Sequence, residues 1–190
     1  MIYFFESLAF IFAFVYSSFF EWFFHRYFMH MERRPLQDVY LLHTKDHHVA
    51  FRVTNFEWAK PGPEPRVTMP WYALPGILLA HLPLIALGEW ATGKPVFLGA
   101  AFGLVFYFAC YEYLHYLMHL PKGHWVEGRR WFRFLWTHHC LHHRFMGRNF
   151  NVVLPLADFC LGTLITARDR RCGAYGAACL TPRRKIGSGR

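Results

Sequence analysis

With 190 residues, the chain is long enough for one domain or one compact membrane unit. Its hydrophobic fraction of 54%, with 21 phenylalanines, is too apolar and too aromatic for a disordered chain. The formal net charge of +9 is compatible with nucleic-acid binding, but the long apolar runs favour a basic surface against a membrane instead. We therefore expect a membrane protein with no nucleic-acid partner.

Three apolar segments, at residues 2–24, 71–91 and 96–118, are long enough to cross a bilayer. A spanning helix needs about 20 such residues. The second and third segments are joined by a short turn at 91–95, which predicts a helical hairpin in the membrane. The predicted fold class is all-α, with about three spanning helices and a histidine-rich helical cap.

The chain beyond the third segment contains shorter elements. Residues 131–136 are aromatic and basic, which suits an interfacial helix, and residues 149–163 are apolar but too short to span the membrane. We expect residues 1–167 to form one domain. Residues 168–190 are basic and lack periodicity, so we expect a flexible tail.

Positive charge predicts the orientation of the spans. Residues 25–69 contain seven Lys or Arg and residues 120–190 contain thirteen, whereas residues 71–118 contain only Lys94. Basic segments flanking membrane helices stay on the cytoplasmic side. The N-terminus and the Lys94 turn are then outside, and all histidine clusters are predicted to be cytoplasmic.

Ten of the 13 histidines fall into four clusters with spacings of one to five residues. The clusters are His25 and His30; His43, His47 and His48; His115 and His119; and His139, His142 and His143. Any one such pair is as often a set of surface residues as a metal site. Four clusters on one membrane face favour metal binding, and ten imidazoles exceed the roughly four to six ligands of one ion, which predicts two metal ions.

Helical geometry predicts which rings meet. Offsets of three and four share a helix face, so His139, His142 and His143 are expected to point to one site. His43 and His47 are expected to face together for the same reason. By contrast, His25 and His30 are five apart and can share a metal only if the helix ends or distorts between them.

Two carboxylates precede histidines at helical spacing. Glu21 lies four residues before His25, and Glu112 lies three residues before His115. We predict that each accepts a hydrogen bond from its histidine and orients the ring. The alternative for Glu21 is a carboxylate in water at headgroup level. His81, in the middle of the second apolar segment, belongs to no cluster.

The five cysteines are odd in number and include no C-x2-C pair, so we expect a reducing compartment and no disulfide framework. Cys140 lies inside the last histidine cluster, and we interpret it as a small spacer rather than a ligand.

The pair of predicted metal ions beside a bilayer indicates oxidation of a lipid. Acyl and isoprenoid C–H bonds offer no acidic proton and no electrophile, so an oxidising metal is needed. Iron can change oxidation state and activate oxygen, whereas zinc cannot.

The four clusters together resemble the fatty acid hydroxylase/sterol desaturase superfamily of membrane di-iron enzymes. The resemblance covers about residues 15–165. Residues 21–30, 43–48, 111–119 and 139–143 are similar to the four conserved histidine motifs of that superfamily, and residues 150–163 are similar to the stretch that follows them. It implies that all ten clustered histidines bind two iron ions. It also implies hydroxylation of a lipid, with a fatty acyl chain favoured, using dioxygen and two external electrons. Under this resemblance Asp158 either orients a ligand or caps a helix N-terminus. His124 and His138 lie outside the matched positions and receive no role.

The sequence shows no fused cytochrome b5 domain, so the resemblance implies a separate ferredoxin-like or cytochrome b5-like electron donor. Zinc can replace iron in purified protein, because availability influences which metal is bound. Three alternatives stay open: desaturation of a lipid or sterol, hydroxylation of a carotenoid at the same centre, and a non-catalytic membrane metal-binding protein. Metal transport is disfavoured, because only His81 lies at mid-membrane depth.

Overall fold

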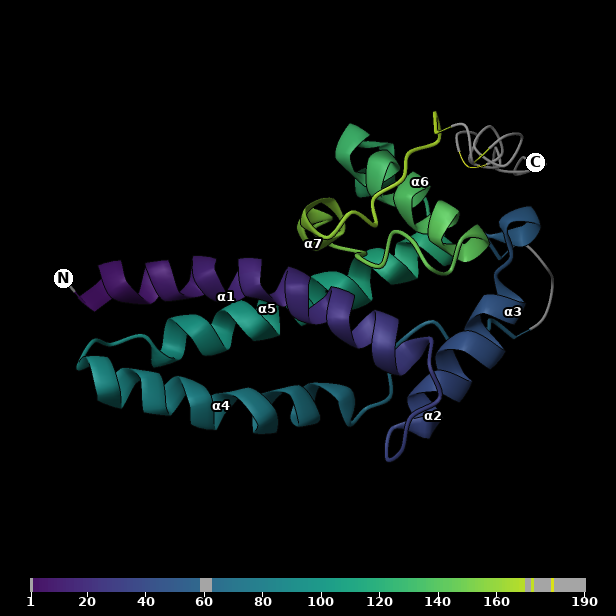
Figure 1. Ribbon diagram of the computed structural model, residues 1–190. Helices are drawn as coiled ribbons and strands as arrows, with labels where there is room; N and C mark the ends of the chain where they lie inside the picture. Colours follow the sequence, from purple (N-terminus) through teal and green to yellow (C-terminus); the bar gives the residue numbers. More distant parts are fainter. Residues whose placement is uncertain (1, 59–62, 170–171, 173–178, 180–190) are drawn as a thin grey trace.

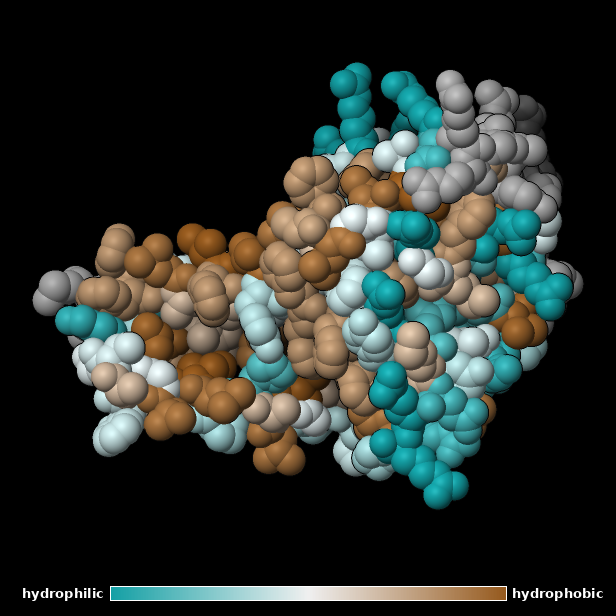
Figure 2. All heavy atoms as spheres, viewed as in Figure 1, coloured by the Kyte–Doolittle hydropathy of each residue, from teal (hydrophilic) through white to brown (hydrophobic). Residues whose placement is uncertain are grey.

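The computed structural model describes residues 2–58, 63–169, 172 and 179, and every regular element within these residues is helical. Three long helices, α1 (Ile2–Phe24), α4 (Ala73–Thr92) and α5 (Phe97–His119), form an arm, and the short helices gather at one end of it as a cap (Figure 1). All three are long and apolar enough to cross a membrane. Figure 2 shows hydrophobic residues covering the arm and hydrophilic residues concentrated on the cap. The predicted all-α membrane fold is confirmed.

Helices α1 and α5 approach each other closely because two glycines of α5 face the backbone of α1. A Cβ atom added at Gly99 would lie 1.9 Å from the backbone oxygen of Glu6, and one at Gly103 would lie 2.8 Å from that of Phe10. The Glu6 carboxylate also accepts a hydrogen bond of 2.5 Å from the Gly99 backbone nitrogen. This contact fixes the two helices side by side, so their far ends enter the cap together.

Helix α4 has the features of a membrane-spanning helix that faces lipid. Trp71 and Trp90, at its two ends, are 83% and 81% exposed. Tryptophan is enriched at the two membrane–water interfaces, where its ring is apolar and its N–H reaches water. Gly93, with φ of 62°, ends the helix in the left-handed conformation.

The cap is built from short helical pieces around α6. In chain order they are η1 (His25–Met29), α2 (Gln37–Tyr40), η2 (Leu41–His47), α3 (His48–Ala50), η3 (Val53–Asn55), η4 (Trp125–Gly128), α6 (Arg130–Arg144) and α7 (Leu156–Cys160). Two of them, η1 and η2, are π-helices, and both carry clustered histidines. The wider turns of a π-helix are rare overall, but those that occur are often found at functional sites.

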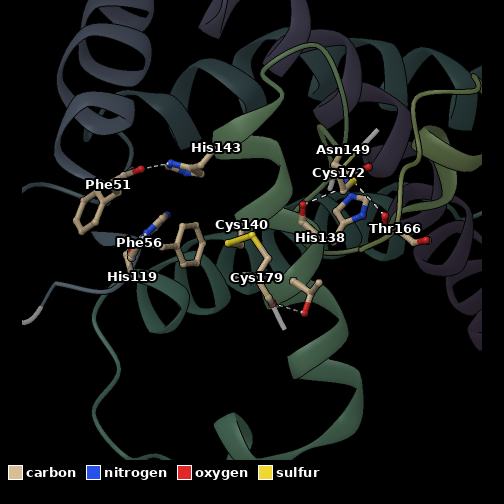
Figure 3. Close-up of a disulfide and its surroundings, with 11 residues drawn as sticks. Phe51, Phe56, His119, His138, Cys140, His143, Asn149, Thr166, Cys172 and Cys179 are labelled. Carbon is tan, nitrogen blue, oxygen red and sulfur yellow. Dashed lines mark hydrogen bonds between the residues drawn. A yellow bond between two sulfur atoms is a disulfide. The ribbon is translucent and has the colours of Figure 1, made fainter. Parts of the chain in front are cut away.

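A disulfide joins Cys140 on α6 to Cys179, and the Thr137 hydroxyl donates to the Cys179 carbonyl at 3.1 Å (Figure 3). The expectation of no disulfide was wrong, because neither an odd cysteine count nor a missing C-x2-C pair bears on two cysteines 39 residues apart that folding brings together. Cys140 is thus a tether and not a mere spacer. Apart from residues 168, 169, 172 and 179, the predicted tail at 168–190 lies outside the described residues.

Candidate metal centre

The ten clustered histidines meet in two adjacent groups of five. The first pocket contains His25, His30, His43, His48 and His142, and the second pocket contains His47, His115, His119, His139 and His143. Within each pocket, one ring nitrogen from every histidine lies within 4.8 Å of the others. Eight of the ten side chains are buried, and His30 and His143 are half-buried. Each pocket can therefore hold one metal ion.

The π-helices bring together residues that are five apart. His25 is the first residue of η1 and His30 directly follows its last, and both rings enter the first pocket, so the distortion that their spacing required is present. His43 and His48 are related in the same way through η2. The expectation that His43 and His47 face together was wrong, because the wider turn directs His47 into the second pocket.

Regular α-helices supply most of the second pocket. His115 and His119 lie four apart on α5, and His139 and His143 lie four apart on α6. The expectation that His142 points to the same site as these α6 rings was wrong. It is rotated by about 100° from its neighbour His143 and enters the first pocket. Helix α6 thus lies between the pockets and contributes to both.

Backbone carbonyls orient the rings through Nδ1. The donor–acceptor pairs are His25 with Phe150, His142 with Arg148, His119 with Phe56, and His143 with Phe51, the last of which is shown in Figure 3. A neutral imidazole that donates from Nδ1 has an unshared electron pair on Nε2. These carbonyls therefore fix which nitrogen faces the pocket, and no sequence motif marks them.

The unshared pairs converge, and this convergence is the test of whether a metal fits. The Thr44 hydroxyl donates its proton to the Met29 carbonyl, so its oxygen accepts a hydrogen bond from Nδ1 of His30. Nε2 of His30 therefore carries no proton, like Nε2 of His142, and these two nitrogens lie 3.0 Å apart. In the second pocket the Nε2 atoms of His119 and His143, neither of which carries a proton, lie 3.1 and 3.2 Å from Nε2 of His139. That third nitrogen carries at most one proton, so it cannot satisfy both of its neighbours fully. A cation relieves this repulsion, and neutral imidazole is a preferred ligand of transition metals.

The charge state of the rings agrees with this role. Burial, followed by repulsion from neighbouring imidazoles, lowers the pKa of His30 to about 2 and holds the pKa of His47 and His139 well below 6.5. These rings are neutral, as a metal ligand must be. Both ring nitrogens of His47 are also buried without a hydrogen-bond partner, and a bound ion would satisfy one of them.

The two predicted orienting carboxylates bind other groups. Glu21 accepts from the Val152 backbone at 2.7 Å and from the Asn151 amide at 3.1 Å, not from His25, whose Nδ1 donates to the Phe150 carbonyl. Glu112 accepts from the backbone of Met69, at 3.1 and 3.3 Å to its two oxygens. It therefore anchors the loop before α4 to α5 and does not bind a histidine ring.

Asp158 holds the same loop as Glu21. Its carboxylate accepts from the backbone nitrogens of Phe150 and Asn151, at 2.9 and 2.7 Å, and from the Thr163 hydroxyl at 2.6 Å. The helix-cap alternative was wrong, because α7 begins after Pro155 and has no side-chain cap. Asp158 therefore acts on the first pocket indirectly, through the loop at 149–152 whose Phe150 carbonyl orients a ligand ring.

His138 is the functional candidate that the sequence did not reveal. Its Nε2 lies 3.0 Å from an Asp158 oxygen, and both side chains are buried. Although burial raises the pKa of Asp158, hydrogen bonds from His138 and Thr163 outweigh it and hold that pKa below 3.8. His138 lies four residues before His142 on α6, a spacing typical of metal ligands, yet it belongs to neither pocket and contacts Asp158 instead.

The sequence model of the fatty acid hydroxylase family matches residues 10–163. The chain belongs to the fatty acid hydroxylase family. The match includes all four histidine clusters and ends at Thr163, so the family's sequence pattern covers the residues that build both pockets. No curated protein and no solved structure matches the chain.

Two cavities adjoin the pockets. The apolar cavity, of about 410 Å³, lies between α1, α4 and α5. The polar cavity, of about 420 Å³, has His43, His47 and His115 in its wall and the exposed Lys45 and Arg66 in its lining. The two cavities share the lining residues Val39, Met69, Pro70 and Tyr111. Their volumes lie in the range of small-molecule sites, and together they extend from the membrane arm to both histidine pockets.

Proposed function

We propose that the protein hydroxylates a C–H bond of a lipid, with a fatty acyl chain favoured, at two iron ions held by the ten clustered histidines. The observation that carries this proposal is the position of His43, His47 and His115. His43 belongs to the first pocket and the other two to the second, and all three line the polar cavity, which adjoins the apolar cavity between the long helices. A chain that extends from one cavity into the other passes the metal ligands.

The reaction balances as a monooxygenation. One oxygen atom of dioxygen enters the C–H bond, the other leaves as water, and two electrons and two protons are consumed. Bound iron would supply the redox cycling that activates dioxygen, which imidazoles alone cannot do. We assign the electrons to a separate ferredoxin-like or cytochrome b5-like donor.

The chain's own residues hold and orient the centre. Neutral rings in each pocket offer Nε2, and the backbone carbonyls behind them fix the ring direction. The aromatic and aliphatic walls of the apolar cavity exclude water from the chain to be oxidised. Glu21 and Asp158 stabilise the 149–152 loop, and Glu112 stabilises the loop that forms the boundary between the two cavities.

We assign the histidine pockets to the cytoplasmic side. The N-terminal end of α1 and the turn between α4 and α5 lie together at the end of the arm opposite the cap (Figure 1). The arginine-rich segments before α4 and after α5 are at the cap end, and basic flanks favour the cytoplasm.

The test is product analysis by lipid mass spectrometry. Wild type, His143→Ala and the exposed control His124→Gln are expressed with an electron donor and supplied with acyl lipids, sterols and carotenoids. We expect a product with one added oxygen from wild type and the control, and none from His143→Ala. A product that lacks two hydrogens would instead show a desaturase. The absence of any product from wild type with two irons bound would contradict the proposal.

A further inference from the structure

A polar pair lies in the middle of the membrane arm, outside both metal pockets. His81 of α4 is 8% exposed, and its Nε2 lies 3.0 Å from the Tyr16 hydroxyl of α1. Its Nδ1 lies 2.7 Å from the Ile77 carbonyl, so Nδ1 donates, Nε2 accepts, and the tyrosine hydroxyl is the donor. The ring also contacts Phe20 edge-on, with centroids 4.8 Å apart. Two polar side chains in an apolar arm thus satisfy each other.

The pair is located at one end of the apolar cavity. Among the lining residues of the three helices, those farthest from the cap are Ser17 of α1, Ala80 of α4 and Leu104 of α5. Tyr16 and His81 are the next residues along α1 and α4. The opposite end of the cavity is formed by residues that also line the polar cavity beside the histidine pockets.

The Tyr16–His81 hydrogen bond also links two helices that both pack on α5. Helix α5 lies between α1 and α4 in Figure 1, and residues of all three helices line the apolar cavity. A hydrogen bond in hydrocarbon resists separation, because the Tyr16 hydroxyl and Nε2 of His81 would each lose the partner that satisfies it. The pair therefore joins α1 to α4 directly beyond the lining residues Ser17 and Ala80.

We propose that the Tyr16–His81 pair is the floor of the acyl-binding cavity and limits the length of chain that can be oxidised. This inference rests on the proposed function. With the reacting carbon beside the histidine pockets, the methyl end of the chain extends along the cavity toward the pair. A chain that is too long must separate the two rings and leave the Tyr16 hydroxyl and Nε2 of His81 without a hydrogen-bond partner in the apolar arm. Chains that stop short of the pair bind without this cost.

The experiment compares wild type with His81→Ala and Ala80→Phe, on saturated acyl substrates that increase stepwise in length. His81→Ala removes the floor, and we expect the ratio of long-chain to short-chain product to rise by about 10-fold, the effect of one or more methylenes in an apolar pocket. Ala80→Phe fills the same end and is expected to lower the ratio. Leu84→Ala, one turn further along α4 and 66% exposed, is the control and should leave the ratio unchanged.

A second readout separates this inference from the proposed function. Native mass spectrometry of purified protein measures the lengths of bound acyl chains without any turnover, and it should show the same shift toward longer chains in His81→Ala. Loss of total protein or total product at an unchanged length ratio would mean that the pair only packs α1 against α4, and would overturn the inference. Absence of hydroxylated product in wild type, with a length shift in the bound lipid, would overturn the proposed reaction and keep the floor.

Discussion

The substitution Asp158→Asn tests whether the 149–152 loop controls the first pocket. The carboxylate accepts from two backbone N–H groups, of Phe150 and Asn151, one at each oxygen. An asparagine has one acceptor oxygen, so in either orientation its NH2 group faces one of these buried N–H groups. Leaving one such donor unsatisfied costs about 1–3 kcal/mol. The nearby partners His138 and Thr163 can adapt, since each can both donate and accept.

We expect the loop to shift enough to misplace the Phe150 carbonyl and with it the His25 ring. Metal affinity of the first pocket should then fall by about 10- to 100-fold, as for other groups that orient ligands. The assay is metal retention against a chelator, together with thermal unfolding in detergent. Asp38→Asn is the control, because this exposed carboxylate accepts a hydrogen bond from the Tyr72 hydroxyl and the amide keeps an acceptor for it. Unchanged metal retention and unchanged unfolding in Asp158→Asn would refute the reasoning.

Three further predictions concern contacts outside the pockets. Gly99→Ala should destabilise the fold by about 1–3 kcal/mol because its Cβ overlaps backbone of α1, whereas Gly88→Ala, with open space around it, should not, as thermal unfolding can show. Cys140→Ala removes the disulfide that closes a loop of 39 residues, and it should lower the free energy of unfolding by up to about 4 kcal/mol. A Cys179 thiol that reacts with a thiol reagent in folded wild type would contradict the pairing. Glu112→Gln should leave metal affinity unchanged, measured by titration, because its oxygens bind backbone and no ligand ring.

The parts of the fold that follow from local pattern could be predicted from the sequence. The three spans are continuous apolar runs, and the i, i+4 pairs on α5 and α6 share a face in any regular helix. The division of the histidines could not be predicted, because it depends on π-helical turns at η1 and η2. Standard helical geometry assigned His47 to the wrong partner and gave no reason to separate His142 from its neighbours.

The groups behind the ligands were the hardest to predict. Glu21 has helical spacing to His25, and that spacing suggested a direct hydrogen bond. In the structure the carboxylate reaches across to Val152, 131 residues away, and a backbone carbonyl occupies the place expected for it. Backbone carbonyls carry no residue identity, so no motif reveals them. His138 shows the same limit: its spacing of four to His142 resembles that of a ligand, and only its tertiary contact with Asp158 separates it from the pocket residues.

The most direct test of the central claim is the number of iron ions per chain after reconstitution in detergent or lipid. Two pockets of five histidines predict two ions in wild type. Substituting His25 and His142 together should remove the ion of the first pocket, and substituting His119 and His139 together should remove that of the second. A wild-type chain that binds a single ion with all ten histidines intact would contradict the account.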